Sequence, residues 1–231
     1  MVPPWGCFLT KSDGSKYDTD YSNIEYVASN SGQTWTTTTK PILLTSTHAN
    51  VYAYYPYDLN YTKITEIPID VTENKDVMWA TPKTGIYNVS STVTMQMNHV
   101  LAVISLSLSK GDYSGSGIIE SILIQGACMA KTGKLNAKTV AVSITDAGAE
   151  IALGSLGSAA TLSATAKTVQ QLVLPTANNG RIKITVKMDG KKYEVTSPPT
   201  AIAQSNSYKY ELYFTDGKLI MSSQYRNYSI G

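Results

Sequence analysis

The feature that most constrains the fold of this chain is an alternation of apolar and polar residues with a period of two, which recurs along nearly its whole length. The stretch HVLAVISLSLS, residues 99–109, shows it clearly, because Ile104, Leu106 and Leu108 alternate with serines. Successive side chains of a β-strand point to opposite faces of its sheet, so this period predicts strands. Residues 99–109 are therefore expected to form one core strand, headed by His99.

Two Asp-Gly pairs predict hairpins. MDGK at 188–191 and TDGK at 215–218 each separate two alternating runs. Glycine adopts the positive φ of a primed two-residue turn without steric cost, so each pair predicts a tight turn. Further strands are expected at 42–44 and at 93–98, the latter leading directly into 99–109. No helix is expected, and the alanine-rich stretch 154–168 is interpreted as a loop because of its glycines and β-branched residues.

The number and spacing of the predicted strands favour two domains. About fifteen short strands are expected in all, and one β-sandwich uses about seven to nine. The polar, glycine-marked segment TGIYNVSST, residues 84–92, is the predicted boundary. We therefore expect an all-β protein with one β-sandwich domain at 1–92 and a second at 93–231.

Composition excludes several classes of protein. Charged residues make up 16% of the chain and the formal net charge is +2, and no dense basic patch is present, so nucleic-acid binding has no electrostatic basis. The polar content is instead Ser, Thr, Asn and Gln, which suits an extracellular surface. Cys7 and Cys128 are the two cysteines. One pair cannot make a disulfide scaffold. Both are interpreted as buried thiols, and the alternative is a disulfide between them.

Catalytic and metal-binding patterns are missing. The two histidines, His48 and His99, stand in a turn and at a strand end. Asp18, Asp20 and Ser22 resemble the first half of a calcium loop, but the sixth-position glycine and the twelfth-position glutamate are absent. We therefore expect no enzyme activity, no metal and no cofactor.

The stretch NVYAYYPYD, residues 50–58, holds four tyrosines. Tyrosine provides apolar bulk with a hydroxyl that reaches a partner, which suits a core strand. Its ring can also stack on a sugar. Tyr52, Tyr54 and Tyr57 are therefore either strand-filling residues or surface aromatic contacts for a glycan.

Several stretches occur in an order that resembles one family. They are YSNIEYVASNSGQTW, PILL, NVYAYYPYD, DVMWATPKT, MNHVLAVISLSLSKG, LVLPT, ITVKMDGKKYEV and SYKYELYF. This ordered set resembles the Bacteroidetes fimbrillins, the subunits of type V pili. The resemblance implies two transthyretin-like, Greek-key β-sandwich domains, lipoprotein export, and a place at the cell surface in a fimbria held to the outer membrane by a lipid anchor. It also implies polymerisation with other pilin subunits by β-strand donation, and adhesion to host or bacterial surface glycans or proteins.

The chain departs from this family at both ends. The start, MVPPWGCFLT, resembles neither a signal sequence nor the family's extra first strand, and Cys7 lies inside a strand-like run, so it is not interpreted as the lipidated cysteine. We therefore expect an open sheet edge in the first domain. The tail from Ser222 to Gly231 is the candidate donor strand, with Tyr225, Tyr228 and Ile230 as its larger side chains. Its alternation is poor, so the alternative is that it stays in its own domain. The expected function is a structural or adhesive pilin subunit, and the alternative is a surface glycan-binding module.

Overall fold

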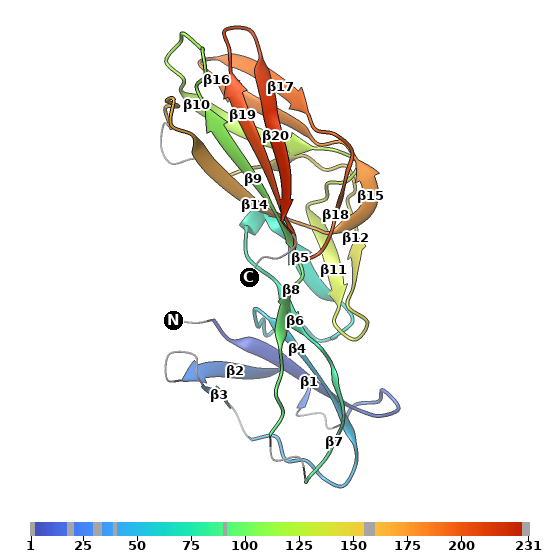
Figure 1. The fold of residues 1–231 in the computed structure, drawn as a ribbon. Helices are drawn as coiled ribbons and strands as arrows, with labels where there is room; N and C mark the ends of the chain where they lie inside the picture. The colour runs from blue at the N-terminus through green and yellow to red at the C-terminus, as the bar shows by residue number, and fades with distance from the viewer. Residues whose placement is uncertain are drawn as a thin grey trace. The chain divides into compact units, whose positions relative to one another are not determined.

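The structure is a computed structural model that describes residues 3–17, 21–29, 34–38, 41–89, 92–154 and 160–227. Twenty strands and the 3-10 turn η3 (Val71–Glu73) are assigned in these residues, which confirms the predicted all-β class for them. Figure 1 shows the ribbon with most of the strands labelled. The strands are β1 (Trp5–Lys11), β2 (Ile24–Ser29), β3 (Thr34–Thr37), β4 (Ala49–Tyr55), β5 (Ile67–Asp70), β6 (Met78–Ala80), β7 (Lys83–Ile86), β8 (Met97–His99), β9 (Ala102–Ser109), β10 (Ile119–Gln125), β11 (Thr132–Asn136), β12 (Ala141–Ile144), β13 (Ile151–Ala152), β14 (Lys167–Val173), β15 (Thr176–Gly180), β16 (Lys183–Met188), β17 (Lys191–Thr196), β18 (Thr200–Ile202), β19 (Ser207–Phe214) and β20 (Leu219–Asn227).

The chain forms two compact units that are built from interleaved stretches. Unit 1 contains Met1–Ile69, Asp76–Val100 and Lys134–Ser143. Unit 2 contains Asp70–Lys75, Leu101–Gly133 and Ile144–Gly231. The expected division into domains at 1–92 and 93–231 stays a prediction.

The largest sheet lies in unit 1 and has the strand order β3-β2-β1-β4-β6-β8, with β7 also pairing with β4. β1 lies inside this sheet, because Cys7 pairs with Ile24 of β2 on one side and with Ala53 of β4 on the other. Residues 6–10 of β1 are buried one after another. Side chains on both faces of the strand are therefore shielded from water.

The tyrosine-rich strand β4 directs two of its tyrosine side chains to one face of this sheet. Tyr52 and Tyr54 are buried on it, and the Tyr54 ring lies 5.9 Å from the ring of Phe8 on β1, centroid to centroid. The Tyr54 hydroxyl donates to the side-chain oxygen of Asn23 at 2.6 Å. The Lys138 ammonium lies 5.6 Å from the Tyr52 ring centre. Tyr52 and Tyr54 are therefore core residues, and the Tyr54 hydroxyl has a partner inside the unit, whereas Tyr55 and Tyr57 are half-buried.

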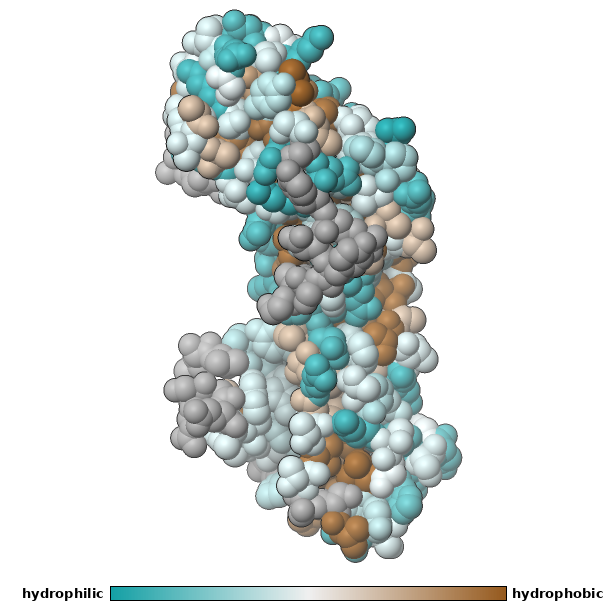
Figure 2. Space-filling view, in the orientation of Figure 1, coloured by the Kyte–Doolittle hydropathy of each residue, from teal (hydrophilic) through white to brown (hydrophobic). Residues whose placement is uncertain are grey.

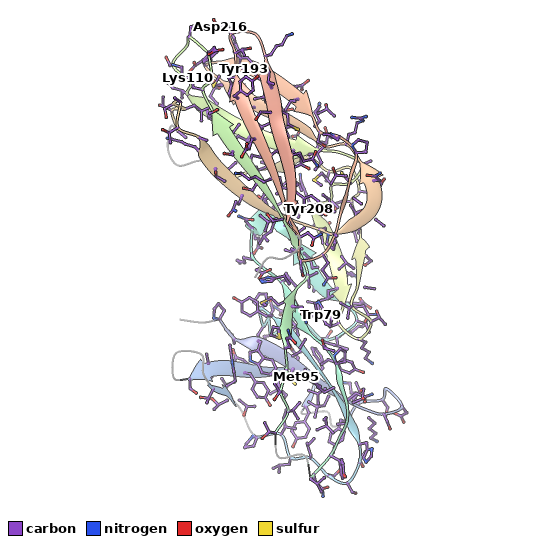
Figure 3. All side chains as sticks on the ribbon, in the orientation of Figure 1. Trp79, Met95, Lys110, Tyr193, Tyr208 and Asp216 are labelled. Atoms are coloured by element: carbon purple, nitrogen blue, oxygen red, sulfur yellow. The ribbon has the colours of Figure 1, made fainter. Side chains whose placement is uncertain are left out.

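Unit 2 contains two four-stranded sheets, in the orders β13-β10-β16-β17 and β14-β9-β19-β20, and the β15-β18 pair. β9 and β19 pair in parallel at the centre of the second sheet. β19, SYKYELYF, buries every second side chain, as its alternation predicts. Phe214 of β19 meets Tyr193 of β17 edge-on, with ring centroids 5.3 Å apart. The buried faces of the two sheets therefore pack together to form the core of this unit, which holds Tyr193 and Tyr208 in Figure 3.

The prediction that His99 heads the serine-rich core strand is wrong. β8 ends at His99 and pairs with β6 in unit 1, whereas β9 begins at Ala102 in unit 2. The break falls at Val100 and Leu101, which are both fully buried. Alternation does not detect this break, because Val100 and Leu101 are apolar and lead without interruption into the apolar positions of β9. The Val100 N–H donates instead to the Val77 carbonyl at 2.8 Å.

Both predicted hairpins form, but only one has the predicted turn. At 188–191, Asp189 and Gly190 both have positive φ (49° and 75°), as a type I′ turn requires. At 215–218, Phe214 pairs with Leu219, and the Thr215 N–H donates to the Lys218 carbonyl at 2.9 Å. The second hairpin therefore has a four-residue loop in place of a two-residue turn.

Candidate functional site

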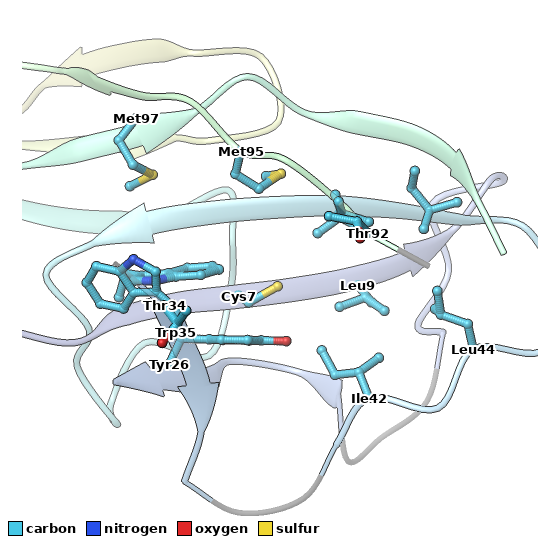
Figure 4. A pocket seen from close by; sticks show the side chains of 14 residues that line it. Cys7, Leu9, Tyr26, Thr34, Trp35, Ile42, Leu44, Thr92, Met95 and Met97 are labelled. Carbon is cyan, nitrogen blue, oxygen red and sulfur yellow. The ribbon is translucent and has the colours of Figure 1, made fainter. Parts of the chain in front are cut away.

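An apolar groove of about 700 Å³ opens in unit 1. Figure 4 shows Met95 and Met97 along one side, Ile42 and Leu44 along part of the other, and Cys7 and Leu9 between them. The lining residues are Trp5, Cys7, Leu9, Tyr26, Thr34, Trp35, Ile42, Leu44, Val51, Ile86, Thr92, Val93, Met95 and Met97.

The floor of the groove is the second face of the large sheet. Cys7 and Leu9 of β1 and Val51 of β4 point into it, whereas Phe8 and Tyr52, one position along each strand, belong to the opposite face. This division follows directly from the period of two in each strand. The same three floor residues are buried members of a hydrophobic cluster.

The walls of the groove are two extended segments, 41–45 and 92–96. In each, side chains alternate between half-buried and exposed, with Ile42, Leu44, Val93 and Met95 pointing into the groove. Both were expected to be strands. Within the described part of the chain neither is assigned to a strand ladder, so the predicted strand at 42–44 is wrong. The predicted strand at 93–98 is wrong over 93–96, and its last two residues belong to β8. Each segment has the side-chain pattern of a strand and lacks the neighbouring strand.

One end of the groove is aromatic. The rings of Trp5 and Tyr26 stack with centroids 4.4 Å apart and an interplanar angle of 13°. Trp35 meets Trp5 edge-on at 5.9 Å. All three rings are half-buried. They form a rigid apolar surface against which another side chain can pack.

The groove is electrically neutral as far as the described residues line it. Its lining contains apolar and aromatic residues and two threonines, and no Asp, Glu, Lys, Arg or His. Burial raises the pKa of the Cys7 thiol to about 12, so this thiol stays protonated at neutral pH. Burial, together with the neighbouring Cys7, raises the pKa of Tyr26 to about 12 as well. Such a surface suits an apolar partner and offers nothing to hold an ionic ligand.

The aromatic residues proposed as surface contacts are mostly inside the protein. Tyr54 has no exposed surface and Tyr52 is 7% exposed, so neither ring is available for the stacking contact that a sugar would need. Tyr57 is half-buried. The proposal of a glycan contact by this group therefore does not fit the burial of Tyr52 and Tyr54.

The proposed donor tail is paired in its own unit as far as it is described. β20 forms the edge of its sheet and runs antiparallel to β19, where Tyr225 pairs with Lys209 and Asn227 with Ser207. Tyr228 and Ile230 lie outside the described residues. The donor role of the tail stays a prediction.

The two histidines and the two cysteines do not form one catalytic or metal-binding cluster. His99 Nδ1 lies 2.7 Å from Asp76 Oδ2, the strand-end hydrogen bond that was expected of it. His48 is exposed and its ring packs on Tyr87, with centroids 4.7 Å apart. Cys7 and Cys128 are both buried free thiols, which confirms their interpretation.

The described ranges hold neither a metal-ligand cluster nor a membrane-spanning helix. No group of three or more His, Cys, Asp or Glu residues is placed there to hold a metal ion. Asp18 and Asp20 of the incomplete calcium pattern lie outside those ranges. In the same part of the chain, no helix is long and apolar enough to cross a membrane.

Sequence reasoning expected an open sheet edge in the first domain but did not identify the residues that form the groove. Its residues come from β1, β2, β3, β4, β7, β8 and the two wall segments, which are far apart in sequence. The available signal was the alternation at 42–44 and 93–98. That alternation correctly predicts which side chains point into the groove, but it does not show that these segments have no neighbouring strand. Figure 2 adds that hydrophobic surface gathers near β7 in this unit, where the structure also exposes Leu43 and Val89.

These observations define the chain as an all-β protein whose first unit has an open apolar groove between unpaired extended segments. The sequence profile of the family described as fimbrillin-like matches residues 4–224. The chain belongs to this fimbrillin-like family. None of the curated proteins matches it.

Two crystal structures share the fold over almost the whole chain. A proposed cell adhesion protein of Bacteroides uniformis has a TM-score of 0.77 at 15% identity, covering 97% of this chain and 90% of that one. A second proposed cell adhesion protein, from Bacteroides ovatus, has a TM-score of 0.71 at 18% identity, covering 99% and 88%. A Bacteroides thetaiotaomicron protein, described as a proposed polysaccharide-binding protein, has a TM-score of 0.53 at 11% identity, covering 98% and 90%.

Proposed function

We propose that this protein is a structural or adhesive pilin subunit of a cell-surface fimbria, without enzymatic activity, and that subunits assemble by adding a β-strand to the groove of unit 1. The observation that supports this most is the pair of wall segments, 41–45 and 92–96. Each has the side-chain alternation of a strand without a ladder partner. One inserted strand would complete both.

Strand addition explains the chemistry of the groove. The main chain of the added strand would hydrogen-bond to the walls, and its alternate side chains would fill the space above Cys7, Leu9 and Val51. A neutral, apolar lining favours such an occupant. An open edge beside apolar positions is otherwise a liability for aggregation. We propose that the occupant is a strand from another copy of this chain, with apolar residues at alternate positions.

The proposed pilin subunit has a defined domain architecture and a defined place in the cell. The two units correspond to two transthyretin-like, Greek-key β-sandwich domains, and the subunit sits at the outer membrane surface through a lipid anchor. Other pilin subunits are its partners. For the tail to be the donor, β20 would have to leave β19, or residues beyond Asn227 would have to do the pairing.

The test compares two neighbouring positions on one wall. Met95 points into the groove and Thr94 points away from it. Wild-type protein and Thr94→Arg are expected to form oligomers that grow with concentration, measured by size-exclusion chromatography with light scattering. Met95→Arg is expected to stay monomeric, because an unpaired charge in the groove opposes the entry of an apolar strand. Equal assembly by Met95→Arg, or a monomeric wild type at every concentration, would contradict the proposal.

Glycan binding is a second candidate. The aromatic end of the groove favours it, because Trp5 and Trp35 are half-exposed, and the Bacteroides thetaiotaomicron structure was assigned to polysaccharide binding. Against it, one face of Trp5 is already covered by Tyr26. Titration with polysaccharides while tryptophan emission is recorded separates the two candidates. Saturable quenching that Trp35→Ala abolishes would support glycan binding.

A further inference from the structure

We infer that the hydroxyls of Tyr17 and Tyr21 act as a substitute strand for one edge of segment 41–45, and so direct strand addition to its other edge. The inference rests on the proposed strand addition in unit 1. It assigns a positioning role to two tyrosines that lie outside the groove lining.

The main-chain hydrogen bonds of the segment are divided between its two edges. The Leu43 N–H donates to the Tyr21 hydroxyl at 2.9 Å, and the Thr45 N–H donates to the Tyr17 hydroxyl at 2.8 Å. Residues two apart on a strand direct their N–H and C=O groups to the same edge. One edge of 41–45 is therefore closed by side-chain hydroxyls at the spacing at which a neighbouring strand would present carbonyl oxygens.

Further hydrogen bonds strengthen the closed edge. The Tyr17 hydroxyl also lies 3.2 Å from the Thr47 carbonyl, to which it donates, and 2.9 Å from the Thr45 hydroxyl. The Thr45 carbonyl accepts the Asn88 N–H at 2.9 Å. These bonds fix residues 43–45 in the absence of a strand ladder, and residues 46–47 form a bend directly after them.

The two tyrosines are themselves fixed by the core of unit 1. Tyr21 is a buried member of the hydrophobic cluster that contains Cys7 and Leu9, and Tyr17 packs against that cluster. The two rings stack with centroids 6.5 Å apart. Their hydroxyls are therefore held in place before any partner arrives, which lowers the ordering cost of strand addition.

The other edge of the segment is open. Ile42 and Leu44 direct their N–H and C=O groups opposite to those of Leu43 and Thr45. Among the described residues, no partner for these main-chain groups is found. Their side chains line the groove. An incoming strand therefore pairs with the main chain of residues 42 and 44, and competes with neither tyrosine.

The first experiment measures amide hydrogen exchange residue by residue in the monomer. The Leu43 and Thr45 amides are expected to exchange about tenfold more slowly than those of Ile42 and Leu44. Tyr21→Phe should remove the protection of Leu43, and Tyr17→Phe that of Thr45. Tyr57→Phe is the matched control, because its half-buried ring belongs to the same unit and the Leu43 and Thr45 amides donate to other tyrosines. Equal exchange of the four amides in the wild type would overturn the inference.

The second experiment measures assembly of the Tyr17→Phe/Tyr21→Phe protein. It should retain the wild-type circular dichroism spectrum and need about a tenfold higher concentration to form oligomers, since a less ordered edge pairs less readily. If the double variant assembles at the same concentration as the wild type while Met95→Arg stays monomeric, the tyrosine role is refuted and strand addition remains supported. Assembly by Met95→Arg would refute strand addition itself. If the double variant unfolds, the exchange data on the single variants decide.

Discussion

The side-chain amide of Gln171 donates a hydrogen bond to the main-chain carbonyl of Val71 at 2.6 Å, across 100 residues of sequence. Gln171 is 2% exposed, so this is a buried polar contact inside unit 2. It joins β14 to the 3-10 turn η3. The Val71 carbonyl also accepts the Asn74 N–H at 3.1 Å, so the Gln171 amide is one of its two donors.

We therefore expect Gln171→Leu to lower the free energy of unfolding by about 1 kcal/mol, because the Val71 carbonyl loses one of its two donors while the volume changes little. Urea unfolding followed by far-ultraviolet circular dichroism measures this. The neighbouring Gln170 has an exposed side chain, so Gln170→Leu should stay within about 0.5 kcal/mol of wild type. An equal effect of both substitutions would show that the buried amide has no special role.

Gly6 is required by the Tyr54 ring. The two residues face each other on β1 and β4, and a β-carbon at Gly6 would overlap the ring of Tyr54. The ring is fully buried and its hydroxyl is held by Asn23, so it cannot turn aside freely. Gly6→Ala should therefore destabilise the protein by about 1–3 kcal/mol, as overpacking of a core does.

The control for this substitution is Gly217→Ala. A β-carbon there would meet no atom within 4 Å, and Gly217 is not among the glycines with positive φ. It should leave the midpoint of thermal unfolding nearly unchanged. A Gly6→Ala protein as stable as wild type would mean that Tyr54 can move.

Asp189 should make stability depend on acid pH. Its carboxylate accepts the main-chain N–H groups of Gly117 (2.7 Å) and Ile118 (2.9 Å) and the Tyr113 hydroxyl (2.9 Å). These bonds, the two main-chain N–H groups first, lower the pKa of Asp189 below its ordinary value of 3.8. Figure 3 shows the end of unit 2 at which this loop region lies, near Lys110 and Tyr193.

Because the folded pKa of Asp189 is below the unfolded one, its contribution to stability is present above pH 3.8 and is lost as the pH falls through the folded value. We expect Asp189→Asn to be less stable than wild type at neutral pH, with a difference that shrinks below pH 3.8. Asn keeps the tolerance for the positive φ of this turn position. Asp112→Asn is the exposed control. A difference that is the same at every pH would contradict this account.

The two thiols should be unreactive in the folded protein. Burial raises the pKa of Cys7 to about 12 and raises that of Cys128 as well, so the reactive thiolate is scarce at pH 8. A disulfide reagent such as Ellman's should therefore titrate almost no thiol in the native protein and both after unfolding in guanidinium chloride. One fast-reacting thiol in the native protein would show that the Cys7 or Cys128 site opens readily.

Local pattern alone determined the class of this fold. Alternation of apolar and polar residues fixes which side chains share a face, so it predicted β19 and the inward residues of β9, β16 and β17. The Asp189-Gly190 pair predicted its turn for an equally local reason, since positive φ is a property of the residues themselves. Weakly patterned strands such as β7 (KTGI) and β15 (TANNG) were missed, because only their partners make them strands.

Only the tertiary structure decided which alternating segments are paired. Residues 42–44 and 93–96 have the pattern of strands and no ladder, whereas β8 and β9 are separate strands inside one stretch that was predicted to be continuous strand. A hydrogen-bonded ladder depends on a second segment far along the chain, and neither its presence nor its absence affects the local alternation. The groove also depends on residues that are far apart in sequence. So do the hydrogen bonds from the Leu43 and Thr45 N–H groups to the two tyrosine hydroxyls.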